Sequence, residues 1–168
     1  TKGDWRNRNK IKTQNGVEWL TVPVHYKKTD QLICKTQIDY STDWRRDHFN
    51  RFSTAYKDAP FLDAALRVLI KAFGRNDNTI SKLNVRLIRI ICHYFGIRTP
   101  MVFSMKYPLF EAKTERLIEL LKHTGATHYL SGPAGKNYLD EIQFALNGIT
   151  LEYKTYNYTP YPQLWGEY

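Results

Sequence analysis

The sequence predicts a three-layer α/β fold, in which helices flank a mostly parallel sheet and a two-strand portion comes first. Residues 99–168 alternate short strand-like and helical segments, a pattern typical of parallel, doubly wound sheets. Residues 41–95 instead repeat apolar side chains every three or four positions, which indicates helices. The chain has 168 residues, of which 42% are hydrophobic, so it can form a single domain with its own core.

The N-terminal portion is predicted to hold two strands. Residues 1–13 form a polar, basic lead-in. β-Branched and aromatic residues predict a strand over 17–24, with Pro23 marking an edge or a strand end. Alternating apolar and polar residues predict a second strand over 33–40. The polar segment 25–32 between them is typical of a hairpin connection.

Three helices are predicted in the middle of the chain. The first is capped by Ser41 or Thr42 and extends to about Tyr56, the second covers Phe61–Phe73, and the third begins at Asp77 or Asn78 and extends to Phe95. Gly74 and Gly96 are suitable helix ends. Arg86, Arg89 and His93 share one side of the third helix, which we interpret as a solvated basic face.

The C-terminal portion is predicted to alternate strands and helices. The strands are Met101–Met105, Thr127–Ser131 and Thr150–Thr155, and the helices are Lys113–Thr124 and Asn137–Leu146. Short connections between these elements are typical of a Rossmann-like, parallel sheet. Right-handed crossovers would place both helices on one face of this sheet, and the central helices would cover the rest.

The positive charge of the chain is concentrated in its first part. The net charge is +9, but residues 1–98 hold 19 Lys and Arg against 9 Asp and Glu, whereas residues 99–168 hold 6 against 7. This asymmetry indicates an anionic partner for the N-terminal side, such as a phosphate, a nucleotide, a nucleic acid or an anionic surface. The alternative is that the charge only keeps the protein in solution.

The cysteines and histidines show no metal-ligand spacing. Cys34 and Cys92 lie far apart, outside any CxxC pattern, and predict two buried free thiols in a reducing compartment. The five histidines form no HExxH or other paired pattern, so no metal is assigned. No apolar stretch approaches about 18 residues and no signal-peptide pattern opens the sequence, so we expect a cytoplasmic protein without a membrane span.

A glycine-containing turn is the sharpest local signal for a ligand site. It runs from Ser131 through Gly132 and Gly135 to Lys136, between a predicted strand and a predicted helix. Ligands of open α/β sheets bind beyond the carboxyl ends of the strands, where turn N–H groups and a helix N-terminus attract anions. The GxxxxGK[ST] spacing of a P-loop is absent. The alternative is an ordinary β–α turn.

The N-terminal segment offers a second candidate anion site. Arg6 and Arg8 alternate in an extended segment and would point to one side, where guanidinium groups bind phosphate or carboxylate in pairs of hydrogen bonds. Trp5 could stack on a base or a sugar. The alternative is a frayed, solvated N-terminus.

Three further places could contribute to a site. Lys113 and Arg116 lie at a predicted helix start, where Thr114 is alternatively a simple N-cap. His48 on the first helix could act in acid–base chemistry. The aromatic segment 156–165 could cover a pocket, or it could pack against the rest of the fold.

Several of these motifs together resemble the WbqC-like proteins. They are DWRNRNKIKT (4–13), EWLTVPV (18–24), DWRRDH (43–48), KTERL (113–117), YLSGPAGKNYLDE (129–141) and YPQLWGEY (161–168). WbqC-like proteins are bacterial and are often encoded in gene clusters for O-antigen or other surface polysaccharides. Family members usually carry an upstream QPxYLPWxGYF-type segment and an apolar C-terminal stretch. Both are absent here, so we expect residues 1–168 to be a fragment of a longer chain.

The resemblance favours functional roles for the residues within these motifs. It favours a cofactor- or ligand-binding role for Arg6, Arg8, Lys113, Arg116, Ser131, Gly132, Gly135 and Lys136. His48 and Lys136 are the candidate catalytic residues, with His48 as a base for an attacking amine. No cofactor can be named from the sequence.

The resemblance implies an enzyme of surface-polysaccharide biosynthesis, of the O-antigen or lipopolysaccharide type. The expected substrate is a nucleotide-activated amino sugar, and the expected reaction is acyl or aminoacyl transfer. Nucleotidyl transfer or acyl adenylation in a Rossmann-like site is an alternative. A non-catalytic nucleic-acid-binding module is another, although no RRM, KH or helix-turn-helix signature supports it. A structural role in a glycan-assembly complex is also open.

Overall fold

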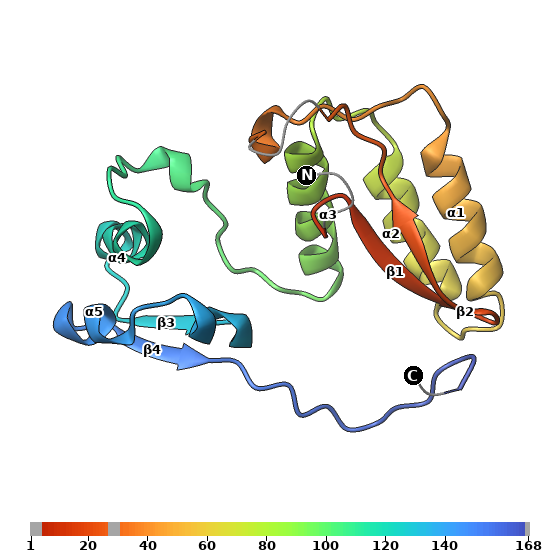
Figure 1. Ribbon diagram of the computed structural model, residues 1–168. Helices are drawn as coiled ribbons and strands as arrows, with labels where there is room; N and C mark the ends of the chain where they lie inside the picture. Colours follow the sequence, from red (N-terminus) through yellow and green to blue (C-terminus); the bar gives the residue numbers. More distant parts are fainter. Residues whose placement is uncertain (1–4, 27–30, 167–168) are drawn as a thin grey trace. The chain divides into compact units, whose positions relative to one another are not determined.

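The computed structural model describes residues 5–26 and 31–166, which fall into two compact units (Figure 1). The first unit draws on 1–98 and 161–168, and the second unit covers 99–160. The organisation of 1–168 as a single domain stays a prediction.

The first unit begins with an antiparallel hairpin. Strand β1 (Arg8–Thr13) pairs with strand β2 (Gly16–Thr21) across a turn in which Gly16 takes a φ of +105°. The lead-in 1–13 was not expected to contain a strand, but Ile11 and Thr13 are buried and draw this segment onto the helices. The strand predicted over 17–24 is confirmed as far as Thr21.

The second strand predicted in this unit, over 33–40, is wrong. Ile33–Lys35 forms a short 3₁₀ helix, η1, and only isolated bridges follow, between Val24 and Ile38 and between Gln37 and Thr79. The hydroxyl of Thr36 donates to the carbonyl oxygen of Leu32 at 3.0 Å. Such local hydrogen bonds compete with a strand ladder, which explains the difference. Of the predicted connection 25–32, residues 27–30 lie outside the described part.

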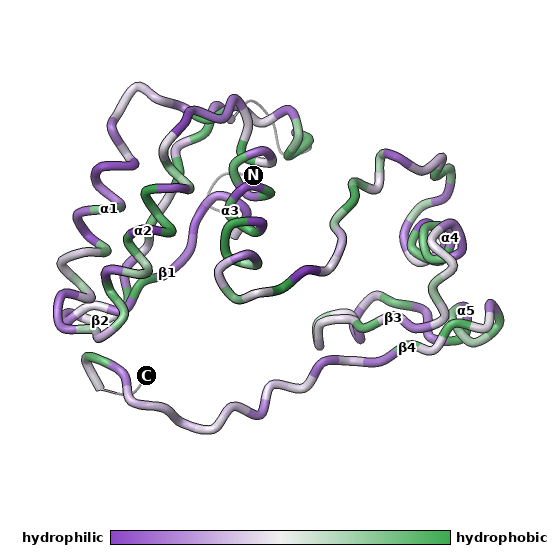
Figure 2. Tube along the Cα trace, turned by 180° about the vertical axis from the view of Figure 1, so that it is seen from behind, coloured by the Kyte–Doolittle hydropathy of each residue, from purple (hydrophilic) through white to green (hydrophobic). Residues whose placement is uncertain are grey.

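Three helices complete the first unit: α1 (Trp44–Ala55), α2 (Leu62–Phe73) and α3 (Ile80–Tyr94). Their expected positions are confirmed, but the caps differ. Asp43 accepts from the backbone N–H of Arg46, and Thr79 accepts from that of Lys82, each one or two residues after the expected cap. In Figure 2, α1 is largely hydrophilic, whereas α2 and α3 carry hydrophobic segments.

The core of the first unit forms where α1 and α3 meet the segment after η1. Its buried side chains are Ile38, Trp44, Ile80 and Leu83. Phe73 packs its ring edge-on against Trp44 at 5.3 Å between centroids, which links α2 to the same core. The core therefore joins all three helices.

An ion pair lies beside this core. Arg86 Nε donates to Asp77 Oδ2 at 2.8 Å, and the side chains are 12% and 5% exposed. The interpretation of Arg86 as part of a solvated basic face is therefore wrong, whereas Arg89 and His93 are exposed as expected. Asp77 does not cap α3 but anchors it through Arg86.

The second unit contains a two-stranded parallel sheet. Strand β3 (His128–Ser131) pairs in parallel with β4 (Thr150–Tyr153), as the alternating pattern predicted. Helix α4 (Lys113–Thr124) precedes the pair, and α5 (Glu141–Leu146) connects its strands. The predicted helix over 137–146 begins late because Pro133–Asn137 forms a 3₁₀ helix, η3.

Both helices of the second unit cover the same face of the sheet. Ile118 and Leu121 of α4 are buried together with Phe144 of α5 and Ile149. Tyr129 and Leu151, which share a sheet face because they are register partners, pack against this cluster. On the opposite face Leu130 is 59% exposed.

The α/β class is confirmed, but an extended sheet is not found among the described residues. They contain one antiparallel and one parallel sheet, each of two strands. The strand predicted over 101–105 is wrong, because this segment pairs with no other described strand and leads into the 3₁₀ helix η2 (Ser104–Lys106).

The two cysteines are less buried than the sequence predicted. Cys34 is exposed and Cys92 is half-buried, so the prediction of two buried thiols is wrong.

None of the helices in the described part combines the length and the apolar character that a membrane crossing requires.

Replacement of Asp77 by alanine should lower the free energy of unfolding by about 3 kcal/mol, because it leaves the Arg86 charge largely buried without its partner. Urea titration followed by circular dichroism measures this value. Asp58→Ala, which removes an exposed carboxylate from the same unit, is the matched control and should change stability by less than about 0.5 kcal/mol. Equal effects of the two substitutions would contradict the anchoring role of Asp77.

Candidate functional site

The residues predicted to bind or react are divided between the two units. Arg6, Arg8 and His48 belong to the first unit. Lys113, Arg116, Ser131, Gly132, Gly135 and Lys136 belong to the second. Each group is therefore a candidate site by itself.

The glycine-containing turn at the end of β3 is a tightly packed corner. Ser131 is buried, and its hydroxyl donates to the carbonyl oxygen of Gly132 at 3.1 Å. The N–H of Gly135 donates to the same carbonyl oxygen at 2.9 Å. A Cβ atom on Gly135 would lie 2.2 Å from Ser131 Oγ, so any larger residue would force the Ser131 side chain to move. The hydroxyl of Ser131 and the glycine at 135 therefore shape the corner.

Lys136 brings a positive charge to the carboxyl end of the parallel strands. Its Nζ lies 5.2 Å from the ring centre of Tyr153, the last residue of β4. The Tyr153 hydroxyl donates to Glu141 Oε1, in the first turn of α5, at 2.9 Å. Partial desolvation, followed by the hydrogen bond to Glu141, raises the pKa of Tyr153, so the phenol stays protonated. A cation, a phenol and a carboxylate thus meet at one corner.

Tyr153 and Glu141 were not predicted as site residues. The parallel register pairs Ser131 with Tyr153, so the last residue of each strand lies at the same edge of the sheet. The strand predicted over 150–155 ends at Thr155, so the sequence did not single out Tyr153 as the partner of Ser131. Nothing in the sequence pattern singled out Glu141, because its role depends on where α5 begins.

A groove begins at this corner. It has a volume of about 470 Å³ and lies between α5 and β4. Its lining residues are Glu141, Phe144, Ala145, Gly148, Ile149, Thr150 and Leu151. Glu141 is therefore shared by the Lys136–Tyr153 corner and by the groove, whose lining is partly polar and partly apolar.

The start of α4 lies beside the start of α5. Thr114 is buried, and its hydroxyl accepts from the backbone N–H of Asp140 at 3.3 Å. Thr114 is therefore not the N-cap, a position that Ala112 occupies without a side-chain hydrogen bond. Lys113 is the first residue of α4, and its backbone takes a φ of +53°, a value that residues other than glycine rarely adopt.

Arg116 holds the loop that leads into α4. Its Nη1 donates to the carbonyl oxygens of Leu109 and Glu111, at 3.3 and 3.4 Å. This side chain is exposed, and its two backbone partners orient the guanidinium along the loop. Lys113 is the other basic residue predicted near this helix start. Unlike Arg116, its side chain makes none of the hydrogen bonds found among the described residues, so its charge is open to a ligand.

In the first unit, the two arginines are each stacked on a tryptophan. The Arg8 guanidinium carbon lies 4.1 Å from the ring centre of Trp19, and that of Arg6 lies 4.8 Å from Trp5. Lys10 Nζ lies 5.1 Å from the Trp19 ring. The expected extended conformation is confirmed from Arg8 onward. Trp19 was not predicted as part of this site.

His48 is buried in the core of the first unit. Its Nε2 lies 3.0 Å from the carbonyl oxygen of Thr21, and its ring packs edge-on against Trp44. Desolvation lowers the pKa of His48, and the hydrogen bond to Thr21 opposes this shift. The neutral ring therefore donates to Thr21 and ties α1 to β2. A role as a catalytic base stays a prediction.

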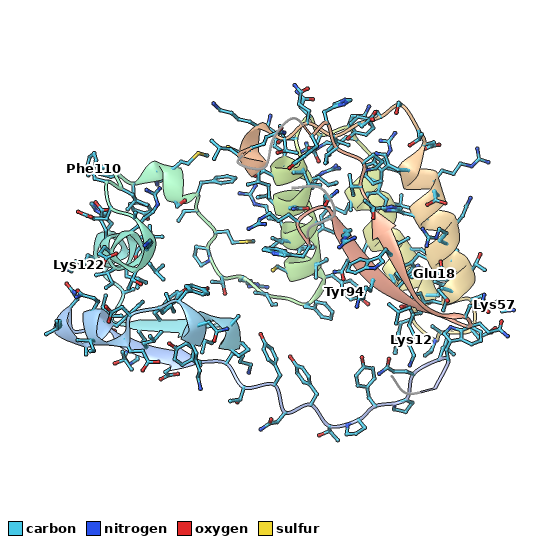
Figure 3. All side chains as sticks on the ribbon, in the orientation of Figure 1. Lys12, Glu18, Lys57, Tyr94, Phe110 and Lys122 are labelled. Atoms are coloured by element: carbon cyan, nitrogen blue, oxygen red, sulfur yellow. The ribbon has the colours of Figure 1, made fainter. Side chains whose placement is uncertain are left out.

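The end of the C-terminal aromatic segment, from Tyr161 onward, belongs to the first unit and contacts it through a few polar groups. Trp165 Nε1 donates to the carbonyl oxygen of Ala55 at 2.8 Å. Lys12, labelled in Figure 3, donates from Nζ to Gln163 Oε1 at 3.4 Å and also to the carbonyl oxygen of Gly166. The packing interpretation is thus confirmed only near Trp165, because Tyr156, Tyr158 and Tyr161 are exposed. Residues 167–168 of the YPQLWGEY motif lie outside the described part.

The described residues contain no group of three or more His, Cys, Asp or Glu side chains that could hold a metal ion.

A second depression, of about 430 Å³, lies along α4 and α5 and is lined by three carboxylates. They belong to Glu111, Glu115 and Glu119. Glu119 accepts from the backbone N–H groups of Phe110 and Glu111, so part of this negative charge orders the loop before α4. Lys122 also lines the depression, but the carboxylates outnumber it, which disfavours an anionic ligand there.

Comparison with known proteins gives one family and one similar protein. Residues 1–168 match the WbqC-like protein family. A protein of Mycobacterium tuberculosis (strain ATCC 25618 / H37Rv), described as uncharacterized protein Rv1507c, is 41% identical over 169 residues. This similarity covers 99% of the present chain and 73% of the mycobacterial protein. No solved structure matches the chain.

Replacement of Gly135 by alanine should destabilise the second unit by about 1–3 kcal/mol, because the new Cβ would overlap Ser131 Oγ. Thermal unfolding measures the effect. Gly132→Ala is the matched control, since a Cβ there meets nothing within 4 Å. The double variant Ser131→Ala with Gly135→Ala should recover part of the loss. Equal stability of the two single variants would show that the corner is loosely packed.

The stability of the first unit should fall as the pH decreases below about 6.5, partly through His48. Because the pKa of His48 is lower in the folded state than its ordinary value of 6.5, the unfolded chain binds the proton more tightly. The contribution is complete above pH 6.5 and is lost as the pH falls through the folded pKa. His48→Gln keeps an N–H donor without a titrating ring, so its melting temperature should fall less between pH 7.5 and 5.5. An identical decrease in both proteins would rule out this contribution.

Proposed function

The chain belongs to the WbqC-like protein family, and we propose that it acts as a transferase in bacterial surface-polysaccharide biosynthesis of the O-antigen type. The proposed reaction transfers an acyl or aminoacyl group to the amine of a nucleotide-activated sugar in the cytoplasm. The observation that carries the proposal is the corner formed by Lys136, Tyr153 and Glu141 at the carboxyl end of the parallel strands. The occurrence of family members in surface-polysaccharide gene clusters supports the substrate class.

Lys136 is the proposed partner of the nucleotide phosphates. Its side chain is exposed and lies beside an aromatic ring, so its charge is available to a ligand without a competing carboxylate contact among the ion pairs found in the described chain. The contact between Thr114 and Asp140 brings the start of α4 next to that of α5, which makes Lys113 a second cation near the same corner. Ser131, Gly132 and Gly135 then act by holding the turn that carries Lys136.

Glu141 is the proposed proton acceptor for the sugar amine. In the transfer, the amine nitrogen forms a bond to the acyl carbonyl carbon, the bond from that carbon to the donor's leaving group breaks, and the amine loses a proton. The Glu141 carboxylate lines the 470 Å³ groove, where it would take this proton, and the Tyr153 hydroxyl orients it. His48 belongs to the first unit, so its predicted role as a base is a separate prediction and not part of this corner.

The arrangement of the sheet also belongs to this proposal. A Rossmann-like, three-layer fold would place the nucleotide at the carboxyl ends of parallel strands. The parallel pairing of β3 and β4 across α5 supports that arrangement. Nucleotidyl transfer or acyl adenylation would use the same edge of the sheet, so the choice of ligand distinguishes the reactions.

Lys136→Ala should weaken the binding of UDP- or dTDP-linked amino sugars by about tenfold, which corresponds to 1.4 kcal/mol. Isothermal titration calorimetry measures the affinity, and the melting temperature without ligand should stay unchanged because Lys136 is exposed. Lys122→Ala, another exposed lysine of the second unit, is the matched control. Unchanged affinity in Lys136→Ala would remove this corner from the proposal.

Two further measurements separate the reactions. Glu141→Gln should bind the nucleotide sugar normally but lose transfer activity, because the amide cannot accept a proton. Binding of ATP together with release of AMP or pyrophosphate, without an amino-sugar product, would replace acyl transfer by adenylation or nucleotidyl transfer.

A further inference from the structure

We propose that the outward face of the β1–β2 hairpin is a separate binding site for a nucleoside phosphate. Arg8 and Lys10 would bind the phosphate, and Trp19 would hold Arg8 in place and offer its exposed ring edge to the base. This site lies entirely in the first unit and does not rest on the proposed function of the Lys136 corner.

The antiparallel register assembles this site. Lys10 is the direct partner of Trp19, and Arg8 pairs with Thr21, so Arg8, Lys10 and Trp19 share one face of the hairpin. The opposite face carries the buried Ile11 and Thr13. The cations therefore cannot turn inward without breaking the register, and they stay on the outward face.

The charges on the two faces of the hairpin are separated. The outward positions of the two strands hold Arg8, Lys10, Lys12, Val17, Trp19 and Thr21, without a carboxylate. Glu18 lies on the other face, where Oε2 accepts from Arg51 Nη2 at 2.6 Å. The Lys12 ammonium binds the C-terminal segment instead. Arg8 and Lys10 thus form a positive patch that no acidic side chain of either strand neutralises.

The Arg8 side chain is held in position while part of its hydrogen-bonding capacity is unused. Its guanidinium stacks on Trp19 at 4.1 Å, which limits its motion. Its Nε–H is buried and has no hydrogen-bond partner among the described residues. A buried donor without a partner is costly in a folded protein, so the stacking on Trp19 holds Arg8 in place at the expense of this N–H group. A ligand on the outward face would therefore be bound by the charge of the guanidinium and not through Nε.

The exposed ring of Trp19 selects for a ligand that carries a base. Trp19 is 42% exposed although it lies in the middle of a paired strand. A ring exposed beside two cations suits a ligand that combines a flat aromatic group with a phosphate. A nucleoside diphosphate fits the three side chains, whereas a longer single strand would need additional stacking residues along the same face.

The test is a calorimetric titration of the full chain with UDP and ADP, carried out in a Lys136→Ala background so that the other corner does not contribute. Trp19→Phe and Arg8→Lys should each weaken binding by fivefold or more, and Lys10→Ala by about threefold. Lys57→Ala and Phe61→Leu, an exposed cation and an exposed aromatic residue elsewhere in the first unit, should have no effect. Circular dichroism checks that each variant is folded.

Several results would overturn the proposal. Inorganic phosphate that binds as tightly as UDP would show that the ring has no part in recognition. Affinity unchanged in both Trp19→Phe and Arg8→Lys would place binding elsewhere. Failure of UDP and ADP, with salt-sensitive binding of a short oligonucleotide, would replace the nucleoside phosphate by a nucleic acid. Because Lys136 is absent from every protein used, none of these results depends on the fate of the Lys136 corner.

Discussion

Backbone pairing between neighbouring strands decides which side chains of this protein share a surface. In the hairpin, the pairing of Lys10 with Trp19 places the cations and the indole on one face, because successive residues of a strand point to opposite sides. In the second unit, the pairing of Ser131 with Tyr153 brings the ends of β3 and β4 to one edge. Both candidate sites depend on these registers, and a shift of one residue would dismantle either of them.

Packing around the paired strands explains why the registers hold. The burial of Ile11 holds β1 in place, and the hydrogen bond from the His48 ring to the carbonyl oxygen of Thr21 holds β2. In the second unit, Tyr129 and Leu151 hold the strands against the α4 and α5 cluster. The candidate sites are therefore carried by strands that buried side chains hold in register, which reduces the conformational entropy lost when a ligand binds.

Local sequence patterns predicted the helices well and the strands less well. A helix makes its backbone hydrogen bonds within its own segment. The three- and four-residue spacing of apolar side chains around Trp44 and Leu83 was therefore enough to predict α1 and α3. A strand needs a partner, and the segments 33–40 and 101–105 have strand-like composition without a continuous described partner. The basic segment that forms β1 shows the reverse case, because only Ile11 among its inward positions is apolar, whereas Asn9 and Thr13 are polar and leave no clear alternation.

The sequence by itself determined the α/β class, the parallel β3–β4 pair and the positions of the basic residues, because these follow from local periodicity and composition. Only the tertiary structure decided their surroundings. In the folded protein the Ser131 hydroxyl lies close to Gly135, Arg86 is largely buried beside Asp77, and Glu141 accepts a hydrogen bond from Tyr153. Burial and hydrogen-bond partners depend on segments far apart in the chain, and the chemistry of a side chain follows from those neighbours.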